Sequence, residues 1–430
     1  MSRVISRLER LPLLIVAVAA VLLAAFAWQV ALPGATRLTN GFSAYYTAAR
    51  LLRAGSDAAR FYDDAWFQAQ TLALGFANAR DIFNVNPPAA ALLLWPLAGL
   101  APGAAKAVWT GLNLLLAGAS LLLVTRLAGG SVRAGALFVA LATLYQPLRE
   151  EIRLGQAYAL LLLLEVAFAW AYCRGRDSQS GFWLGLLLAL KTAGLALPAL
   201  LIAQRRWRAL AWTGATVVGV IAMTLPLLGG SAWLTYAGLL TRVGAHPELA
   251  VTAYQSLPGF FLHLFRADPT WNPAPLWDFP SLGTALTLLS GLALIGATFA
   301  ITGRADPGAI TARQLGFAAW AILSVELNPG ASDYHYTLLL APIALLVARW
   351  RAAGSPWSTG SALALGVLLV GLPLPYLSPS LGAGGWALLA YPKLYGGLVL
   401  WAVAIGSLAQ AKRSTPKGAS SGAAIPSRMS

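Results

Sequence analysis

The chain has 430 residues, of which 58% are hydrophobic and only 10% are charged. Soluble domains carry about a quarter charged residues, so this composition excludes a soluble globular protein. The net charge of +15 does not indicate a nucleic-acid partner, because the basic residues form short clusters between apolar runs, as in the cytoplasmic loops of membrane proteins.

Apolar runs of bilayer-spanning length, about 20 residues, recur along the whole chain. The first, residues 11–32, is too long for the apolar part of a signal peptide, so we expect it to be an uncleaved span. The runs predict an all-α integral membrane protein, a polytopic bundle of about 12 transmembrane helices. Their centres lie near residues 21, 95, 115, 140, 164, 193, 218, 291, 321, 342, 367 and 397. The runs near 95 and 140 are short, and re-entrant segments are the alternative to full crossings there.

Five basic clusters orient this bundle. They occupy residues 3–10, 205–208, 303–313, 348–351 and 412–417. If all five are cytoplasmic, an even number of crossings separates each pair, and 12 spans satisfy that condition. Both termini are then cytoplasmic, and residues 33–86 and 229–280 form loops on the outer face. Residues 1–410 form a single membrane domain, and the small, polar and basic tail 411–430 is expected to be disordered.

The first outer loop is not polar throughout. Residues 41–55 and 61–76 both carry apolar side chains at helical spacing. This pattern predicts two amphipathic helices lying on the membrane surface.

Three ionisable residues interrupt apolar runs, where a charge is costly. Lys191 lies near the middle of its run, too far from either interface for its ammonium group to reach water easily, so it is expected to face a polar cavity and bind phosphate or a carboxylate. Glu165 and Glu326 are functional candidates by the same argument, although a neutral, hydrogen-bonded glutamic acid is an equally good interpretation.

The stretch NPGASDYHY, residues 328–336, places an acid, a histidine and two tyrosines at the predicted outer edge of a span. Asp333 and His335 are close enough to share a catalytic pocket. Other polar stretches adjoin apolar runs in REEIRLGQAY, with Arg153 and Gln156, and in YQSLPGF, with Tyr254 and Gln255. No His, Cys and carboxylate group has zinc-site spacing, and no glycine-rich nucleotide cradle occurs, so neither a metal nor a cofactor is expected.

Seven stretches in order resemble the bacterial glycosyltransferase family 87, over about residues 10–410. They are NGFSAYYTAARLLRAG, RFYDD, FNVNPPAAALLLWPLAGL, LGQAYALLLLL, LALKTAGLALPALLIAQRRWRAL, YQSLPGF and NPGASDYHYTLLLAP. The resemblance implies a GT-C fold in a bacterial inner membrane. It also implies inverting transfer of a sugar, mannose or a related pentose, from a polyprenyl-phosphate donor to a lipid or glycan acceptor on the outer face, within a layer of membrane lipids.

The resemblance also implies an acidic general base just after the first span. Asn40 stands at that position, and an amide cannot accept a proton as a carboxylate does. Another acid is therefore expected to replace it, in the order Asp333, Asp81, then Asp63 and Asp64. His335 corresponds to the family's late histidine-bearing loop. The predicted substrate-binding residues are Asn40, Tyr45, Tyr46, Arg153, Gln156, Lys191, Tyr254 and Gln255.

Two other functions fit the sequence. A transporter or lipid flippase would use Lys191, Glu165 and Glu326 along an ion pathway, but no internal repeat is evident. A catalytically inactive member of the family that binds polyprenyl lipid would explain Asn40.

Overall fold

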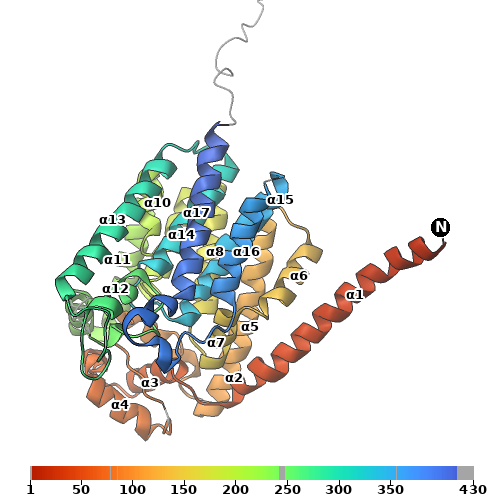
Figure 1. Ribbon diagram of the computed structural model, residues 1–430. Coiled ribbons are helices and arrows are strands. Elements are labelled where there is room, and N and C mark those ends of the chain that lie inside the picture. Colours follow the sequence, from red (N-terminus) through yellow and green to blue (C-terminus); the bar gives the residue numbers. More distant parts are fainter. Residues whose placement is uncertain (1, 78, 85, 242–246, 355, 414–430) are drawn as a thin grey trace, which may run out of the picture.

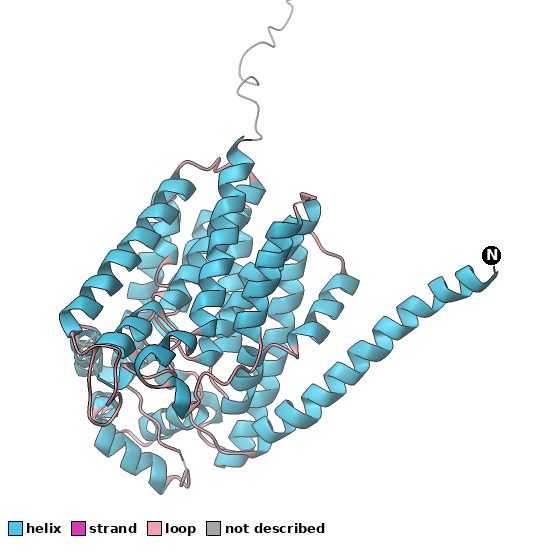
Figure 2. Cartoon of the chain, viewed as in Figure 1, coloured by secondary structure: helices cyan, strands magenta, loops and turns pink. Residues whose placement is uncertain are grey.

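The computed structural model of the chain describes residues 2–77, 79–84, 86–241, 247–354 and 356–413, and the predicted tail lies almost entirely outside them. The described residues form helices and connecting loops without a β-strand (Figures 1 and 2). The helices are α1 (Ser2–Phe26), α2 (Leu32–Thr36), α3 (Phe42–Arg53), α4 (Asp64–Ala73), α5 (Pro102–Leu127), α6 (Val132–Ala142), α7 (Gln146–Leu154), α8 (Tyr158–Cys173), α9 (Asp177–Leu190), α10 (Leu197–Ala203), α11 (Trp207–Leu240), α12 (Leu257–Phe265), α13 (Pro280–Gly303), α14 (Ile310–Glu326), α15 (Leu340–Ala352), α16 (Trp357–Gly371) and α17 (Pro392–Arg413).

The bundle has two chemically different ends. At one end, here called the basic end, short connections between helices are joined by hydrogen bonds. Arg206 donates to Asp177 (2.7 Å), Arg313 to the carbonyl of Cys173 (2.8 Å) and Gln314 to the carbonyl of Leu127 (2.7 Å). The opposite end, here called the loop end, carries α3, α4 and the long loops (Figure 1). This separation agrees with the predicted grouping of the basic clusters on one side of the membrane.

The central helix of the bundle is α14. Every side chain from Leu315 to Glu326 is buried, because neighbouring helices, including α8, α15 and α17, surround it. The interior of the bundle is packed with leucine, alanine and aromatic residues. This dense packing holds the polar side chains of the loop end in fixed positions.

Helices α9 and α10 form a hairpin rather than one span. Residues 177 and 206 would be roughly 40 Å apart if this segment were a continuous helix, yet their side chains are joined by the hydrogen bond at the basic end. The chain turns back after Leu190, and Gly194 adopts a left-handed φ of 78° in the turn. Lys191 is therefore at the tip of the hairpin.

Five helical segments are long and apolar enough to cross a bilayer: residues Leu14–Thr36, Pro102–Leu127, Trp207–Leu240, Pro280–Gly303 and Pro392–Gln410. The protein is thus an all-helical membrane protein, and the count of about 12 spans stays a prediction. Two predicted crossings were wrong. The segment near residue 95 forms two short 3₁₀ helices, Pro88–Leu92 and Trp95–Leu97, because its prolines cannot continue an α-helix.

The second wrong crossing is the single span predicted near residue 193, which is the α9–α10 hairpin. The segment near residue 95 does not cross, which removes one crossing. The segment near residue 193 enters the bundle and returns, which replaces one crossing with two passes. These two errors cancel, so the predicted orientation of the termini and of both outer loops does not change.

The predicted helices of the first outer loop exist, as α3 and α4, but α3 does not present an apolar face to lipid. Nine of its twelve residues are buried. Phe42 and Tyr46 stack with a ring separation of 5.5 Å, and both lie about 6 Å from the ring of Phe76. The apolar periodicity of α3 therefore reflects packing inside the protein, and α3 is part of the layer that covers the loop end.

The orientation can be tested with two cysteines in a Cys173→Ser background. Ala54 is exposed at the loop end and Ala353 is exposed at the basic end, and neither has the left-handed backbone of Gly55. We expect an impermeant maleimide to label Ala54→Cys in intact cells and Ala353→Cys only after permeabilisation. The reverse pattern would contradict the predicted topology.

Candidate functional site

The carboxylate of Asp81 binds the N-terminus of α3. Its Oδ2 accepts hydrogen bonds from the N–H of Gly41 (2.5 Å), the hydroxyl of Ser43 (2.7 Å) and the N–H of Ala44 (3.0 Å). Gly41 has a left-handed φ of 86°, and a Cβ there would lie 2.5 Å from Nε2 of Gln156. Oδ1 accepts no hydrogen bond from any described residue, so one carboxylate oxygen is available to a substrate.

Asp81 also lies beside the position where the sequence lacks an acid. Oδ1 of Asn40 accepts a hydrogen bond from the backbone N–H of Arg80 (3.1 Å), so the loop carrying Asp81 is joined to residue 40. The backbone N–H of Asp81 is held in turn by Oε1 of Gln68 from α4 (3.0 Å). The fold therefore brings a carboxylate from residue 81 to the chain just after the first span.

The ammonium group of Lys191 is buried, and its hydrogen-bond partners are neutral, although the carboxylates of Asp81 and Glu151 lie near enough to act on its charge. It donates to Oδ1 of Asn86 (2.7 Å) and to the hydroxyl of Tyr45 (3.2 Å), and Tyr45 donates onward to Oε1 of Gln156 (3.3 Å). No carboxylate among the described residues forms an ion pair with Lys191. A buried cation without a counter-ion is costly, so this position favours the binding of an anion.

His335 packs beside the same group of residues. Its ring centroid lies 4.5 Å from that of Tyr158 and 4.6 Å from that of Tyr334, and Nζ of Lys191 lies 5.7 Å from the Tyr158 ring. Nδ1 of His335 accepts a hydrogen bond from the backbone N–H of Ser332 (3.1 Å), so the neutral ring carries its proton on Nε2. His335 can therefore donate one hydrogen bond to an oxygen of a ligand.

These residues form what we call the lysine cluster: Lys191, Tyr45, Asn86, Gln156, Tyr158 and His335. They come from the α9–α10 turn, α3, the loop after α4, the α7–α8 connection, α8 and the 3₁₀ helix Asp333–Leu339 before α15.

A second buried layer supports the lysine cluster. Glu151 is fully buried and accepts a hydrogen bond from the N–H of Ala159 (3.1 Å), at the N-terminus of the helix that carries Tyr158. Lys106, also fully buried, donates to Thr39 (2.9 Å) and to the carbonyl of Arg153 (3.2 Å). Lys106 thus joins α5 to α7 and to the segment before α3, and Glu151 joins α7 to α8.

Asp333 lies in a separate polar pocket. Its carboxylate is 3.0 Å from Nζ of Lys393 and accepts a hydrogen bond from Tyr376 (3.2 Å). A cavity of about 430 Å³ adjoins these groups, and its other polar lining residues are Gln146, Glu150 and Ser332. We call this the Asp333 pocket. Lys393 and Tyr376 bind the two oxygens of Asp333, and the ion pair with Lys393 weakens the carboxylate as a proton acceptor, so Asp333 is a poorer candidate for a general base than Asp81.

Both carboxyl groups have shifted pKa values. Burial raises the pKa of Asp81 above its ordinary value, and the hydrogen bonds from Ser43, Gly41 and Ala44 oppose this effect. Burial also raises the pKa of Asp333, against the opposing charge of Lys393. A carboxyl group with a raised pKa is a stronger base when it is ionised.

The model of one family, described as glycosyltransferase family 87, matches residues 84–325, more than half of the chain. The chain belongs to glycosyltransferase family 87. The family indicates a glycosyltransferase. The match contains four members of the lysine cluster, Asn86, Gln156, Tyr158 and Lys191, whereas Asp81 and His335 lie outside it. Searches of curated proteins and of solved structures gave no match.

Several predicted site residues of this family-87 chain lie outside the lysine cluster. Asp63 is an exposed cap that accepts from the N–H of Trp66 (3.1 Å), and Asp64 is exposed and accepts from Asn84 (2.9 Å). Neither carboxylate is hydrogen-bonded to a residue of the lysine cluster, so both fit a structural role better than a catalytic one.

Four other predicted substrate-binding residues also lie outside the lysine cluster, and they differ in burial and in hydrogen-bond partners. Tyr46 donates to the carbonyl of Leu100 (2.7 Å) within the loop-end layer. Gln255 is fully buried, and its side chain bridges the carbonyls of Thr252 and Ala390. Arg153 is paired with Glu150 (3.1 Å), and Tyr254 is partly exposed before α12. Tyr46 and Gln255 hold the fold together and are not free to bind a substrate.

Sequence reasoning missed Lys106, Asn86, Glu151 and Tyr158 as parts of the site. Lys106 and Asn113 both interrupt the apolar run of α5, so the argument used for Lys191 applied to them as well. Asn86 was identified only as the last residue of the first outer loop, and no sequence pattern showed that it would contact a residue 105 positions later.

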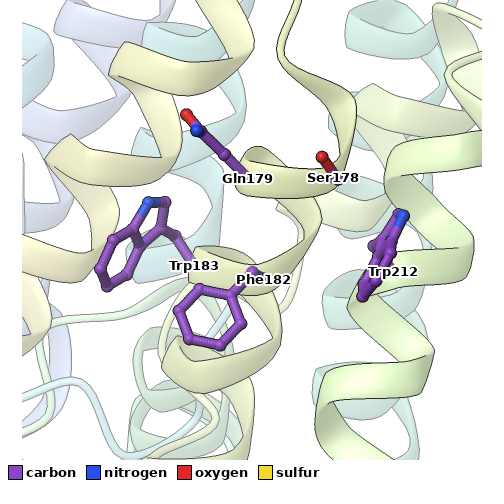
Figure 3. Close-up of a pocket in the computed structure, with 5 residues that line it drawn as sticks. All are labelled: Ser178, Gln179, Phe182, Trp183 and Trp212. Atoms are coloured by element: carbon purple, nitrogen blue, oxygen red, sulfur yellow. The ribbon is translucent and has the colours of Figure 1, made fainter.

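A second hollow lies at the basic end, far from this chemistry. It has a volume of about 380 Å³ and is lined by Ser178, Gln179, Phe182, Trp183 and Trp212 from α9 and α11 (Figure 3). Its aromatic side chains are typical of a membrane interface, and it holds no acid or base that could act on a sugar.

Proposed function

We propose that this family-87 protein transfers a sugar, mannose or a related pentose, from a polyprenyl-phosphate donor to a lipid or glycan acceptor at the outer face of a bacterial inner membrane. Lys191 and His335 bind the phosphate of the donor. Asp81 takes the proton from the acceptor hydroxyl that attacks the sugar. The attack displaces the lipid phosphate with inversion at the anomeric carbon.

The observation that carries this proposal is the unpaired ammonium group of Lys191. Its partners among the described residues, Tyr45 and Asn86, are neutral, so phosphate can supply the missing negative charge. Nε2–H of His335 adds a donor beside it. A lipid phosphate needs such a cationic site near the membrane, and it does not need a soluble nucleotide fold.

The position of Asp81 supports the role of general base. Only Oδ2 is used to bind α3. Burial raises the pKa of Asp81, and the three hydrogen bonds to Oδ2 and the charge of Lys191 oppose that rise and so favour the ionised form. General bases contribute about 10²–10⁴-fold to a rate. Asp81 therefore replaces the acid that is absent at residue 40.

The phosphate site predicts the effect of replacing Asn86. In Asn86→Asp, a carboxylate would lie at the 2.7 Å position beside the Lys191 ammonium and act as an internal counter-ion. We expect the affinity for polyprenyl phosphate to fall about tenfold, or about 1.4 kcal/mol. Equilibrium binding of labelled polyprenyl phosphate to the purified protein in nanodiscs measures this.

Asn86→Ala is the matched control, because it removes the same hydrogen bond without adding a charge. It should bind the lipid nearly as well as the unmodified protein. Equal losses in both variants, or unchanged binding in Asn86→Asp, would show that the phosphate does not bind at Lys191.

The transporter alternative is less well supported. Glu326 is bonded to Tyr336 (3.2 Å) inside the core, and Glu165 has an oxygen without a partner among the described residues. Neither is bonded to Lys191, so the three ionisable groups do not form a connected ion pathway. Uptake of labelled lipid or ions into vesicles would favour that alternative.

A further inference from the structure

The Asp333 pocket has the size and chemistry of a ligand site. Its volume of about 430 Å³ lies within the usual range of about 300–1,000 Å³ for small-molecule pockets. One part of its lining is polar, with Gln146, Glu150, Asp333 and Tyr376. The other part is apolar and includes the prolines and leucines of residues 373–377.

The charges of this pocket favour a neutral ligand. Two carboxylates, Glu150 and Asp333, line it, and no lysine or arginine is among its lining residues. Lys393, the nearest cation to Asp333, is fully buried and also donates to the carbonyl of Val370 (2.7 Å). Both acids already have a cationic partner, since Lys393 pairs with Asp333 and Arg153 with Glu150, so the described lining residues offer a phosphate no unpaired cation. Sugar hydroxyls can still donate hydrogen bonds to the carboxylate oxygens.

The pocket shares a wall with the lysine cluster. Tyr334 lines the pocket, and its ring lies 4.6 Å from the ring of His335 and 5.2 Å from that of Tyr158. Leu154, which also lines the pocket, is two residues before Gln156. A ligand in the pocket would therefore lie next to the proposed phosphate site, separated from it by one aromatic side chain.

We propose that the Asp333 pocket binds the sugar ring of a glycosylated acceptor, with Asp333 and Glu150 accepting hydrogen bonds from its hydroxyl groups. The residues 373–377 contact the apolar face of the ring. Asp333 is then a residue for acceptor recognition rather than the general base. This inference rests on the proposed function, because it assigns the second substrate of the same reaction.

Photolabelling can test the inference without turnover. The probes are alkyl mannoside, glucoside and galactoside, each carrying a diazirine on the alkyl group next to the sugar, and the protein is held in nanodiscs. We expect at least one probe to label residues 146–150 and 373–377, as mapped by mass spectrometry. Excess unlabelled alkyl hexoside should prevent the labelling, and polyprenyl phosphate should not.

Two matched variants extend the test. Tyr376→Phe removes the hydroxyl that binds Asp333, and it should raise the probe concentration needed for half-maximal labelling about fivefold. Tyr395→Phe removes a hydroxyl that donates to the carbonyl of Leu388 outside the pocket, and it should have no effect. Absence of labelling with all three probes, competition by polyprenyl phosphate, or equal effects of both variants would overturn the inference.

Failure of this inference differs from failure of the proposed function. If the unmodified protein transfers sugar but no probe labels the pocket, only the assignment of the acceptor site is wrong. If the pocket is labelled but polyprenyl-phosphate sugar is never consumed, the pocket is a glycoside site and the proposed reaction is wrong.

Discussion

Replacing Asp81 with asparagine is expected to lower the rate of sugar transfer at least a hundredfold while donor binding changes little. The amide cannot accept the proton of the acceptor hydroxyl, and a lost general base costs about 10²–10⁴-fold. The fold should survive, because asparagine caps a helix N-terminus about as well as aspartate and its oxygen can still accept from Gly41, Ser43 and Ala44. Steady-state transfer and polyprenyl-phosphate binding measure the two effects.

Asp63→Asn is the matched control. Asp63 caps α4 by accepting from the N–H of Trp66, so it has the same structural role at an exposed position. We expect this variant to keep full activity. If Asp81→Asn is as active as Asp63→Asn, Asp81 is only a helix cap and the base lies elsewhere.

The activity of the unmodified protein should also depend on pH through Asp81. A base acts only when it is ionised, and burial raises the pKa of this carboxyl above its ordinary value. Transfer should therefore fall as the pH decreases through the raised pKa, and the acidic limb of the profile should be absent from the residual activity of Asp81→Asn.

Replacing Lys191 with methionine is expected to abolish both donor binding and turnover. Methionine keeps most of the length of the side chain but cannot neutralise a phosphate, and removal of a preorganised electrostatic contact costs about 10²–10³-fold in rate. Expression should stay near normal, because Lys191 has no ion-pair partner among the described residues to be left uncompensated and methionine removes the cost of burying its charge. Binding of labelled polyprenyl phosphate separates this variant from Asp81→Asn, which should still bind.

Lys412→Met is the matched control, because it also replaces a lysine with methionine but lies near the C-terminal end of α17, far from Lys191 in the sequence. It should change neither donor binding nor turnover. If Lys191→Met binds and transfers as well as Lys412→Met, the lysine is merely tolerated at the hairpin tip. The phosphate site would then have to be sought elsewhere.

Much of the fold could be predicted from composition and periodicity. Apolar runs and basic clusters predicted the all-helical bundle and the grouping of the basic connections at one end. They could not reveal the α9–α10 hairpin, because its two helices and its turn together have the length and hydropathy of one span. The end of α9 at Leu190, the left-handed Gly194 and the hydrogen bond between Asp177 and Arg206 show that the chain turns back.

The site was predicted less completely, for a physical reason. Lys191 and His335 were singled out because a charge or an imidazole is unusual beside an apolar run. Asp333 was ranked above Asp81 because it lies two residues from His335, and no sequence pattern shows that residue 81 contacts residues 40–44. The structure places Asp81 beside residue 40 and gives Asp333 an ion pair with Lys393, and for this reason we propose Asp81 rather than Asp333 as the base.

The most direct test of the central claim is transfer from radiolabelled polyprenyl-phosphate sugars by the purified protein in nanodiscs, with alkyl glycosides or water as acceptor. The donor panel should include polyprenyl-phosphate mannose and a polyprenyl-phosphate pentose. We predict that at least one donor is consumed, with inversion at the anomeric carbon, by the unmodified protein and not by Lys191→Met. Tight binding of these lipids without any consumption of donor would contradict the claim and identify a lipid-binding relative that has lost catalysis.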